Sequence, residues 1–149
     1  MAKFKYKFER LLNIKEIEEK KEYSELVRIR EAIKIKIGEK EEVNKKVIEL
    51  ENNIEKLEVF SVDQMKYYNS RFVELDNEIE KIQKNIEKLQ DNEKVQNEKV
   101  IEISKKKKIL EKLKEKHRLA FNKEEERKLN KVLDELGTRG FIRKGRGSL

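Results

Sequence analysis

Apolar residues recur along the second half of the chain in steps of three and four. The series opens with Met65, Tyr68, Phe72, Leu75, Ile79, Ile82, Ile86 and Leu89. The same frame continues to Phe121, but polar residues such as Lys107 and Lys114 occupy more of its later positions. Alternating steps of three and four are the heptad pattern of a left-handed coiled coil. The pattern predicts a helix over residues 62–136 whose packing seam is strong early and weak late.

The first half of the chain carries the same spacing and predicts a helix over residues 4–60. Its series is Leu26, Ile29, Ile33, Lys36, Lys40, Val43, Val47, Leu50, Ile54 and Leu57. Gly38 lies inside this helix, where a glycine costs about 1 kcal/mol relative to alanine. The two series do not share one frame, because eight residues instead of seven separate Leu57 from Met65. The chain therefore breaks between the two helices.

The break predicts a hairpin turn near residues 58–64. Ser61 and Gln64 fit a capping box, in which the serine hydroxyl and the glutamine side chain bond each other's backbone N–H groups. An antiparallel register that starts at the turn gives the pairs Leu57–Met65, Ile54–Tyr68, Leu50–Phe72, Val47–Leu75 and Val43–Ile79. One continuous helix paired between molecules is the alternative. The predicted fold is all-α, an antiparallel two-helix coiled coil over residues 1–136.

The end of the second helix is predicted to extend past the first, over about residues 119–136. Leu129, Val132, Leu133 and Leu136 follow helical spacing there and form an apolar stripe that the first helix cannot cover. An uncovered apolar stripe favours a protein-binding surface. Gly137 is the predicted helix stop. Residues 137–149 are rich in glycine and basic residues and are predicted to form a disordered tail.

The composition fits a coiled coil better than a globular domain. Charged residues make up 46% of the 149 residues and apolar ones 36%, with no proline, tryptophan or cysteine. That apolar share is small for a compact core and sufficient for a two-helix seam. Disorder is the rival interpretation of so polar a chain, and the sustained heptads argue against it.

Charge and hydropathy limit the classes of binding partner that the sequence predicts. The net charge of +7 arises mostly from interleaved acids and bases; Lys105–Lys108 and the tail are the one-sided exceptions. Neither cluster has aromatic residues suited to stacking on bases, so nucleic acid is not an expected partner. No apolar run approaches the roughly 20 residues that span a bilayer. The basic start lacks the apolar stretch of a secretory signal, and a cytoplasmic location is expected.

The sequence offers no chemistry of an active site. Without cysteine there is no thiolate ligand or nucleophile, and the single histidine, His117, has no converging ligands. Four of the five glycines lie in the tail, so no glycine-rich phosphate loop is present. A filled coiled-coil seam also leaves no pocket that could desolvate a catalytic group. The prediction is a protein with no catalytic residues, no cofactor and no metal.

Two aromatic groups have alternative interpretations. Phe4, Tyr6 and Phe8 either form a binding surface at the open end or anchor the first helix onto residues 114–121. Tyr68 and Phe72 occupy seam positions near the turn, where packing is the simpler interpretation.

Several segments follow one another in a distinctive order along the chain. The opening carries Phe4-Lys-Tyr-Lys-Phe8-Glu9-Arg-Leu11-Leu12 and then Ile17-Glu18-Glu19. The end carries Leu110-Glu-Lys-Leu113, then Lys123-Glu124-Glu125-Glu126, then Leu133-Asp134-Glu135. In their order and spacing these segments resemble the FliJ family, the stalk proteins of the flagellar type III export apparatus. The chain departs from the family where Lys128-Leu129-Asn130-Lys131 replaces the usual Glu-Gln-Lys before Leu-Asp-Glu.

The resemblance implies an antiparallel coiled coil whose joined ends insert into the ring of the export ATPase and promote its hexamer. We assign that contact to Phe4, Phe8, Leu129, Val132, Leu133, Asp134, Glu135, Leu136, Arg139, Phe141 and Arg143. It also implies binding to the cytoplasmic linker of the export-gate membrane protein, assigned to Tyr68, Phe72 and Leu75. Escort of export chaperones and a place at the inner face of the cell membrane, reached through partners, complete the expectation.

Two other functions remain open at this point. One is a generic structural or scaffold coiled coil, which would not stimulate an ATPase. The other is a holdase-type chaperone of prefoldin-like form. That fold inserts β-hairpins between its helices, and residues 58–64 are too short for them.

Overall fold

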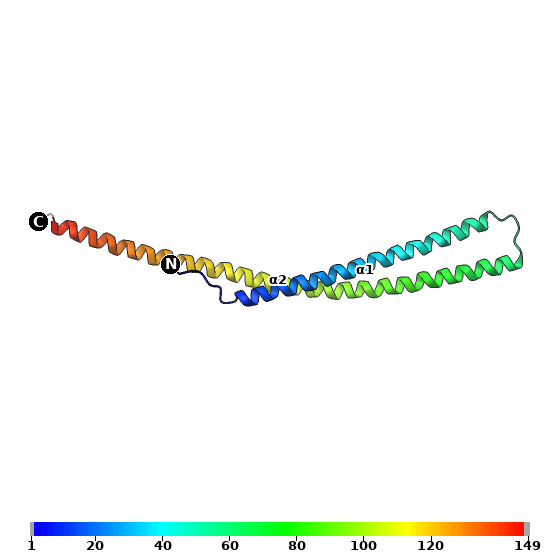
Figure 1. Cartoon of the computed structure of the whole chain (residues 1–149), viewed down its shortest axis with the longest axis horizontal. Helices are drawn as coiled ribbons and strands as arrows, with labels where there is room; N and C mark the ends of the chain where they lie inside the picture. Colours follow the sequence, from blue (N-terminus) through cyan, green and yellow to red (C-terminus); the bar gives the residue numbers. More distant parts are fainter. Residues whose placement is uncertain (1, 148–149) are drawn as a thin grey trace. The chain divides into compact units, whose positions relative to one another are not determined.

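The computed structural model describes residues 2–147, which form two α-helices joined by a turn (Figure 1). Helix α1 spans Glu9–Glu55 and helix α2 spans Val62–Gly147. The two helices pack against each other in opposite directions, as the two offset heptad series predict. The all-α hairpin is confirmed.

Helix α1 is shorter at both ends than the predicted 4–60. Residues 2–8 are not helical, and the first turn is marked by the Glu9 N–H donating to the Tyr6 carbonyl at 3.2 Å. At the other end the helix stops at Glu55, and the Leu57 N–H bonds the Ile54 carbonyl at 3.0 Å in a tighter turn. A tight last turn of this kind satisfies carbonyls that the helix can no longer pair.

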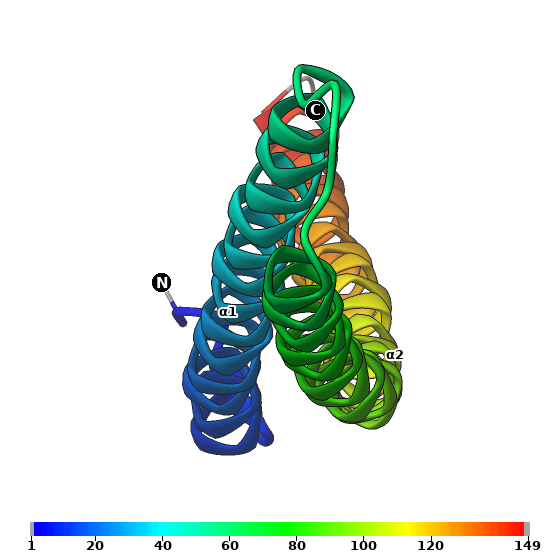
Figure 2. The same cartoon turned by 90° about the vertical axis from the view of Figure 1, so that its right-hand side faces the viewer.

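Helix α2 begins at Val62, directly after Ser61, as the capping box predicts. Figure 2 shows the turn that leads into this helix. The Ser61 N–H donates to Oε1 of Gln64 at 3.0 Å, and the Gln64 N–H donates to Oγ of Ser61 at 3.1 Å. This reciprocal pair satisfies two backbone donors that the first turn of a helix leaves unpaired. The predicted capping box is therefore confirmed.

The predicted end of α2 at Leu136 is wrong, because the helix continues through Gly137 to Gly147. A glycine ends a helix by adopting a left-handed conformation, and no described glycine has a positive φ. A Cβ added at Gly137 would meet nothing within 4 Å, so this glycine is not required by packing either. The predicted tail is helical over residues 137–147. Residues 148–149 and the side chains of Lys144 and Arg146 lie outside the described part.

The described residues divide into two compact units. The turn unit is Glu19–Glu102, and the terminal unit combines residues up to Glu18 with those from Ile103 onward. The turn unit holds a core cluster of Val43, Leu75, Ile82 and Ile86, against which Val47, Leu50 and Ile79 pack. Both members of the predicted pairs Val47–Leu75 and Val43–Ile79 thus lie in one cluster.

Polar contacts also join the two helices across the turn unit. The same register, continued by three residues, sets Lys40 opposite Ile82, and the Lys40 ammonium donates to Oε1 of the adjacent Gln83 at 2.8 Å. Gln96 is a buried polar residue in the seam, and its Nε2 donates to both the carbonyl and the carboxylate of Glu22, at 2.8 and 2.6 Å. With both bonds made, burial of this amide donor carries no desolvation penalty from an unpaired group.

Candidate protein-interaction surfaces

The non-helical N-terminal segment is anchored on α2 within the terminal unit. Tyr6 is 8% exposed, and its hydroxyl donates to the Leu110 carbonyl at 2.8 Å. Its ring meets His117 edge-on with centroids 5.8 Å apart, and the rings of Phe4 and Phe121 lie 5.6 Å apart. Of the two interpretations of these aromatics, the structure shows the anchoring one.

Phe8 and Glu9 complete this attachment. The Phe8 ring lies 5.8 Å from that of Tyr6, and the Lys7 ammonium sits 5.7 Å above it. The Glu9 carboxylate pairs with the Lys114 ammonium at 2.8 Å. Since Phe4 and Phe8 are half-buried in this arrangement, any partner can contact only part of each ring.

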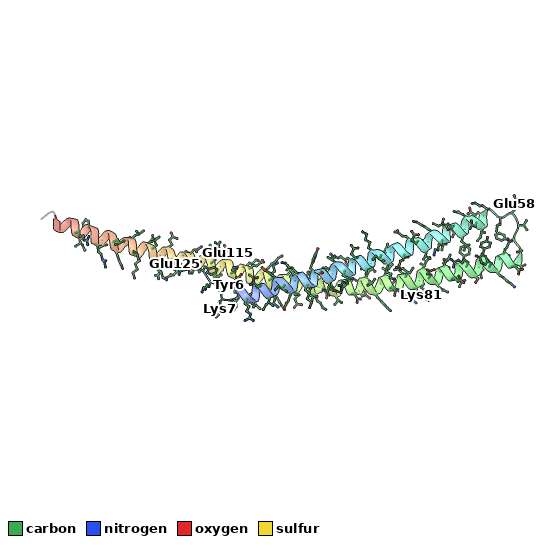
Figure 3. All side chains as sticks on the ribbon, in the orientation of Figure 1. Tyr6, Lys7, Glu58, Lys81, Glu115 and Glu125 are labelled. Carbon is green, nitrogen blue, oxygen red and sulfur yellow. The ribbon has the colours of Figure 1, made fainter. Side chains whose placement is uncertain are left out.

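Farther along α2, the predicted apolar stripe is exposed. Leu129, Val132, Leu133 and Leu136 are each between 51% and 57% exposed. Every described side chain from residue 126 to 143 is exposed, and Figure 3 shows the side chains beyond Glu125 with no second helix beside them. At 100° per residue the four apolar side chains fall within an arc of about 100°. They form one continuous apolar face with nothing in the described chain to cover it.

The other predicted residues of this region are exposed but not all on the stripe. Phe141 is 78% exposed, yet it lies about 120° around the helix from Leu129. Asp134 is displaced by a similar angle. Glu135 and Arg139 flank the stripe on one side, and Arg143 continues the line of the stripe beyond Leu136. A single partner surface on the stripe can therefore reach the two arginines but not Phe141 and Asp134.

Two ion pairs on α2 near the start of the stripe favour the ionised form of their carboxyl groups. Arg118 donates two hydrogen bonds to the Glu115 carboxylate and lowers the pKa of that carboxyl below its ordinary value. Arg127 donates a hydrogen bond to the Glu124 carboxylate at 2.8 Å and likewise lowers the pKa of that carboxyl. These are exposed pairs three residues apart on a helix, which support the helix slightly. They are not candidates for acid–base chemistry.

No group of three or more metal-ligating acidic, histidine or cysteine side chains gathers within the described residues. In that same part of the chain, no helix is long and apolar enough to cross a membrane.

Comparison with known families decides the assignment. The model of the flagellar FliJ protein family matches residues 4–146. The chain belongs to the FliJ family. It is a non-enzymatic component of the flagellar export apparatus. No curated protein and no solved structure matches the chain.

The residues assigned to the export gate are partly enclosed. Leu75 is 1% exposed and packs in the core cluster, so it cannot touch a partner unless the seam opens. Tyr68 and Phe72 are half-buried. The Tyr68 ring meets Phe60 and Tyr67 edge-on, with centroids 6.3 and 5.5 Å away. Each of these two side chains therefore offers only part of its surface to a partner.

An exposed apolar group around the turn was missed by the sequence prediction. Val59, Val62, Met65 and Tyr67 are each at least 60% exposed. The heptad frame placed Met65 in the seam, but α1 ends at Glu55 and leaves the first turn of α2 without a helical partner. The capping box could have signalled this, because it identifies residues 62–65 as a helix's first turn, outside the paired region.

Proposed function

We propose that this FliJ family member is the stalk of the export apparatus, and that its terminal unit inserts into the ring of the export ATPase and promotes assembly of the ring. The observation that carries the proposal is the uncovered apolar stripe at Leu129, Val132, Leu133 and Leu136. Soluble proteins rarely leave a contiguous apolar face on a lone helix without a partner. The resemblance to the family supplies the identity of that partner.

Covering the stripe with a partner surface would contribute favourable binding free energy. Each of the four side chains is about half exposed, so covering it is worth on the order of 1 kcal/mol. Arg139 flanks the same face, Arg143 continues its line, and both are exposed, which suits acidic groups around an apolar partner surface. Because those charges are solvated, their contribution should weaken as salt is added.

The turn unit is our proposed contact with the cytoplasmic linker of the export gate. Tyr68 and Phe72 are half-buried there, and the neighbouring Tyr67 is 63% exposed. Leu75 would act from the core by holding the helices together. Escort of export chaperones, and a cytoplasmic position peripheral to the inner face of the membrane, also belong to this proposal.

The decisive experiment is stimulation of the purified export ATPase. Deletion of residues 126–149 should abolish stimulation while the hairpin stays folded, because side chains 126–143 are exposed. Leu133→Glu should reduce stimulation strongly. Thr138→Glu is the matched control, since it adds the same charge to the opposite face of the same exposed helix.

A scaffold function without ATPase contact predicts a different result. In that case the truncated chain and Leu133→Glu would behave like the parent protein at every salt concentration. Full stimulation by the truncated chain would remove the stalk proposal and leave the scaffold.

A further inference from the structure

The apolar stripe of α2 is nearly symmetric along the helix. Its midpoint falls between Val132 and Leu133, with Leu129 and Leu136 equally far on either side. Two copies of such a stripe can meet face to face in opposite directions, so that Leu129 lies opposite Leu136 of the other copy. A twofold axis between the copies requires this self-complementarity.

The charged residues beside the stripe are also arranged about its midpoint, with each acidic residue on one side matched by a basic residue on the other. Glu125, Lys128, Glu135 and Arg139 all lie along one edge of the stripe. In the antiparallel pair, Glu125 and Arg139 of the second copy differ by only about 1.5 Å in position along the helix axis. Lys128 and Glu135 of the second copy differ by about 3 Å. By symmetry each opposite-charge pair forms twice.

A parallel arrangement would lose these opposite-charge pairs. Its twofold axis runs along the helices, so this edge of one copy would face the opposite edge of the other copy. That opposite edge carries Glu126, Asn130 and Gly137, which offer Glu125 and Glu135 no basic partner. Among the described residues, Lys128 and Glu125 of one copy form a competing ion pair at 3.8 Å, which is long for such a contact. The charge pattern therefore selects the antiparallel arrangement.

We propose that a second copy of this chain covers the stripe, through an antiparallel pairing of residues 125–139 about a twofold axis near Val132 and Leu133. The inference goes beyond the proposed stalk function and does not depend on it. The two uses of the stripe exclude each other, since one apolar face cannot contact a second copy and an ATPase ring at once.

The pairing is small, and this sets its expected strength. Fifteen residues on each helix bury on the order of 1,000 Å² in total, the range of weak and transient complexes. The dimer should therefore dissociate on dilution and weaken in high salt. A weak dimer would protect the apolar face in a free pool of the protein and still release it to a stronger partner.

Single-cysteine variants test the geometry directly, because the chain has no cysteine of its own. Val132 lies next to Val132 of the second copy at the axis, so Val132→Cys should form a disulfide-linked dimer under mild oxidation. Thr138→Cys is the matched control on the opposite, equally exposed face. We expect at least a tenfold faster reaction at position 132, and equal rates would overturn the proposal.

Charge reversal tests the register in the full-length protein by sedimentation across a concentration series. Arg139→Glu should abolish the concentration-dependent dimer, and adding Glu125→Arg should restore it. Within one helix these residues are about 21 Å apart, so restoration requires contact between copies. A protein that stays monomeric at all concentrations contradicts the proposal. Cross-linking at position 132 without restoration would refute the antiparallel register. Neither measurement involves the export ATPase, so the stalk proposal stands or falls separately.

Discussion

Replacing Leu75 with alanine tests whether the seam of the turn unit carries the stability of the hairpin. Leu75 is 1% exposed and packs in the core cluster with Val43, Ile82 and Ile86. Leu→Ala changes at buried sites cost 2–5 kcal/mol, depending on how far the site can collapse. A two-helix seam is open at its sides and can partly collapse, so we expect a loss of about 3 kcal/mol in the free energy of unfolding.

The matched control is Val73→Ala, two residues away on the same helix. Val73 is 50% exposed, and a change at such a position should stay within about 0.5 kcal/mol. Alanine also has a slightly better helix propensity than valine, which works against any loss.

Urea unfolding followed by far-ultraviolet circular dichroism measures both variants. If the two units unfold in separate transitions, the loss should appear in the transition that melts the turn unit. The dependence of the unfolding free energy on urea should not change, because both variants expose the same surface when they unfold. Equal losses at the two positions would refute the view that the cluster around Leu75 is the core.

Three further predictions follow from single contacts. Cysteines at Leu50 and Phe72 should cross-link within one chain, and linkage found only between chains on gel electrophoresis would contradict the hairpin register. Tyr6→Phe removes a buried donor bonded to a main-chain carbonyl at 2.8 Å; it should cost about 1 kcal/mol and speed amide exchange at the start of α1, and unchanged exchange would show that this bond does not anchor the segment. The Glu115 carboxyl should titrate below the ordinary glutamate pKa by NMR, and Arg118→Ala should raise its pKa. Because the folded pKa is lowered, the pair supports the helix above the ordinary carboxyl pKa and ceases to do so as the pH falls through the folded value. A normal pKa in the parent protein would contradict the pairing.

The heptads and the capping box were sufficient to predict the hairpin and its register. Steps of three and four identify the buried face of each helix because side-chain direction depends on spacing alone. Ser61 and Gln64 located the start of α2 because their bonds join residues only three apart. Both signals are local in the chain, and local signals can be read from a sequence.

What escaped prediction depends on contacts between distant residues. Whether Tyr6 continues a helix or packs against α2 is decided by a carbonyl more than one hundred positions away, at Leu110. Met65 fits the heptad frame but has no partner helix at its level, because α1 ends at Glu55. Gly137 could have ended α2, yet a glycine permits a left-handed conformation without requiring it. For the binding surface, the helical spacing of the apolar residues identified the stripe. Phe141 was assigned to the same surface but lies about 120° around the helix from Leu129.

The buried contact between Gln96 and Glu22 bears on how this repetitive sequence avoids misalignment. Heptads rich in Glu, Lys and Ile look alike, so one helix could slide along the other by seven residues and still bury apolar side chains. In such a slipped hairpin Gln96 would face Lys15 or Ile29, neither of which carries an acceptor side chain. Its amide would lose the carboxylate that it contacts at 2.6 Å, and a bond to a charged group is worth about 1.5–3 kcal/mol. This penalty corresponds to at least a tenfold preference for the observed alignment over one shifted by seven residues. The Gln96 side chain therefore helps to specify the register of the two helices.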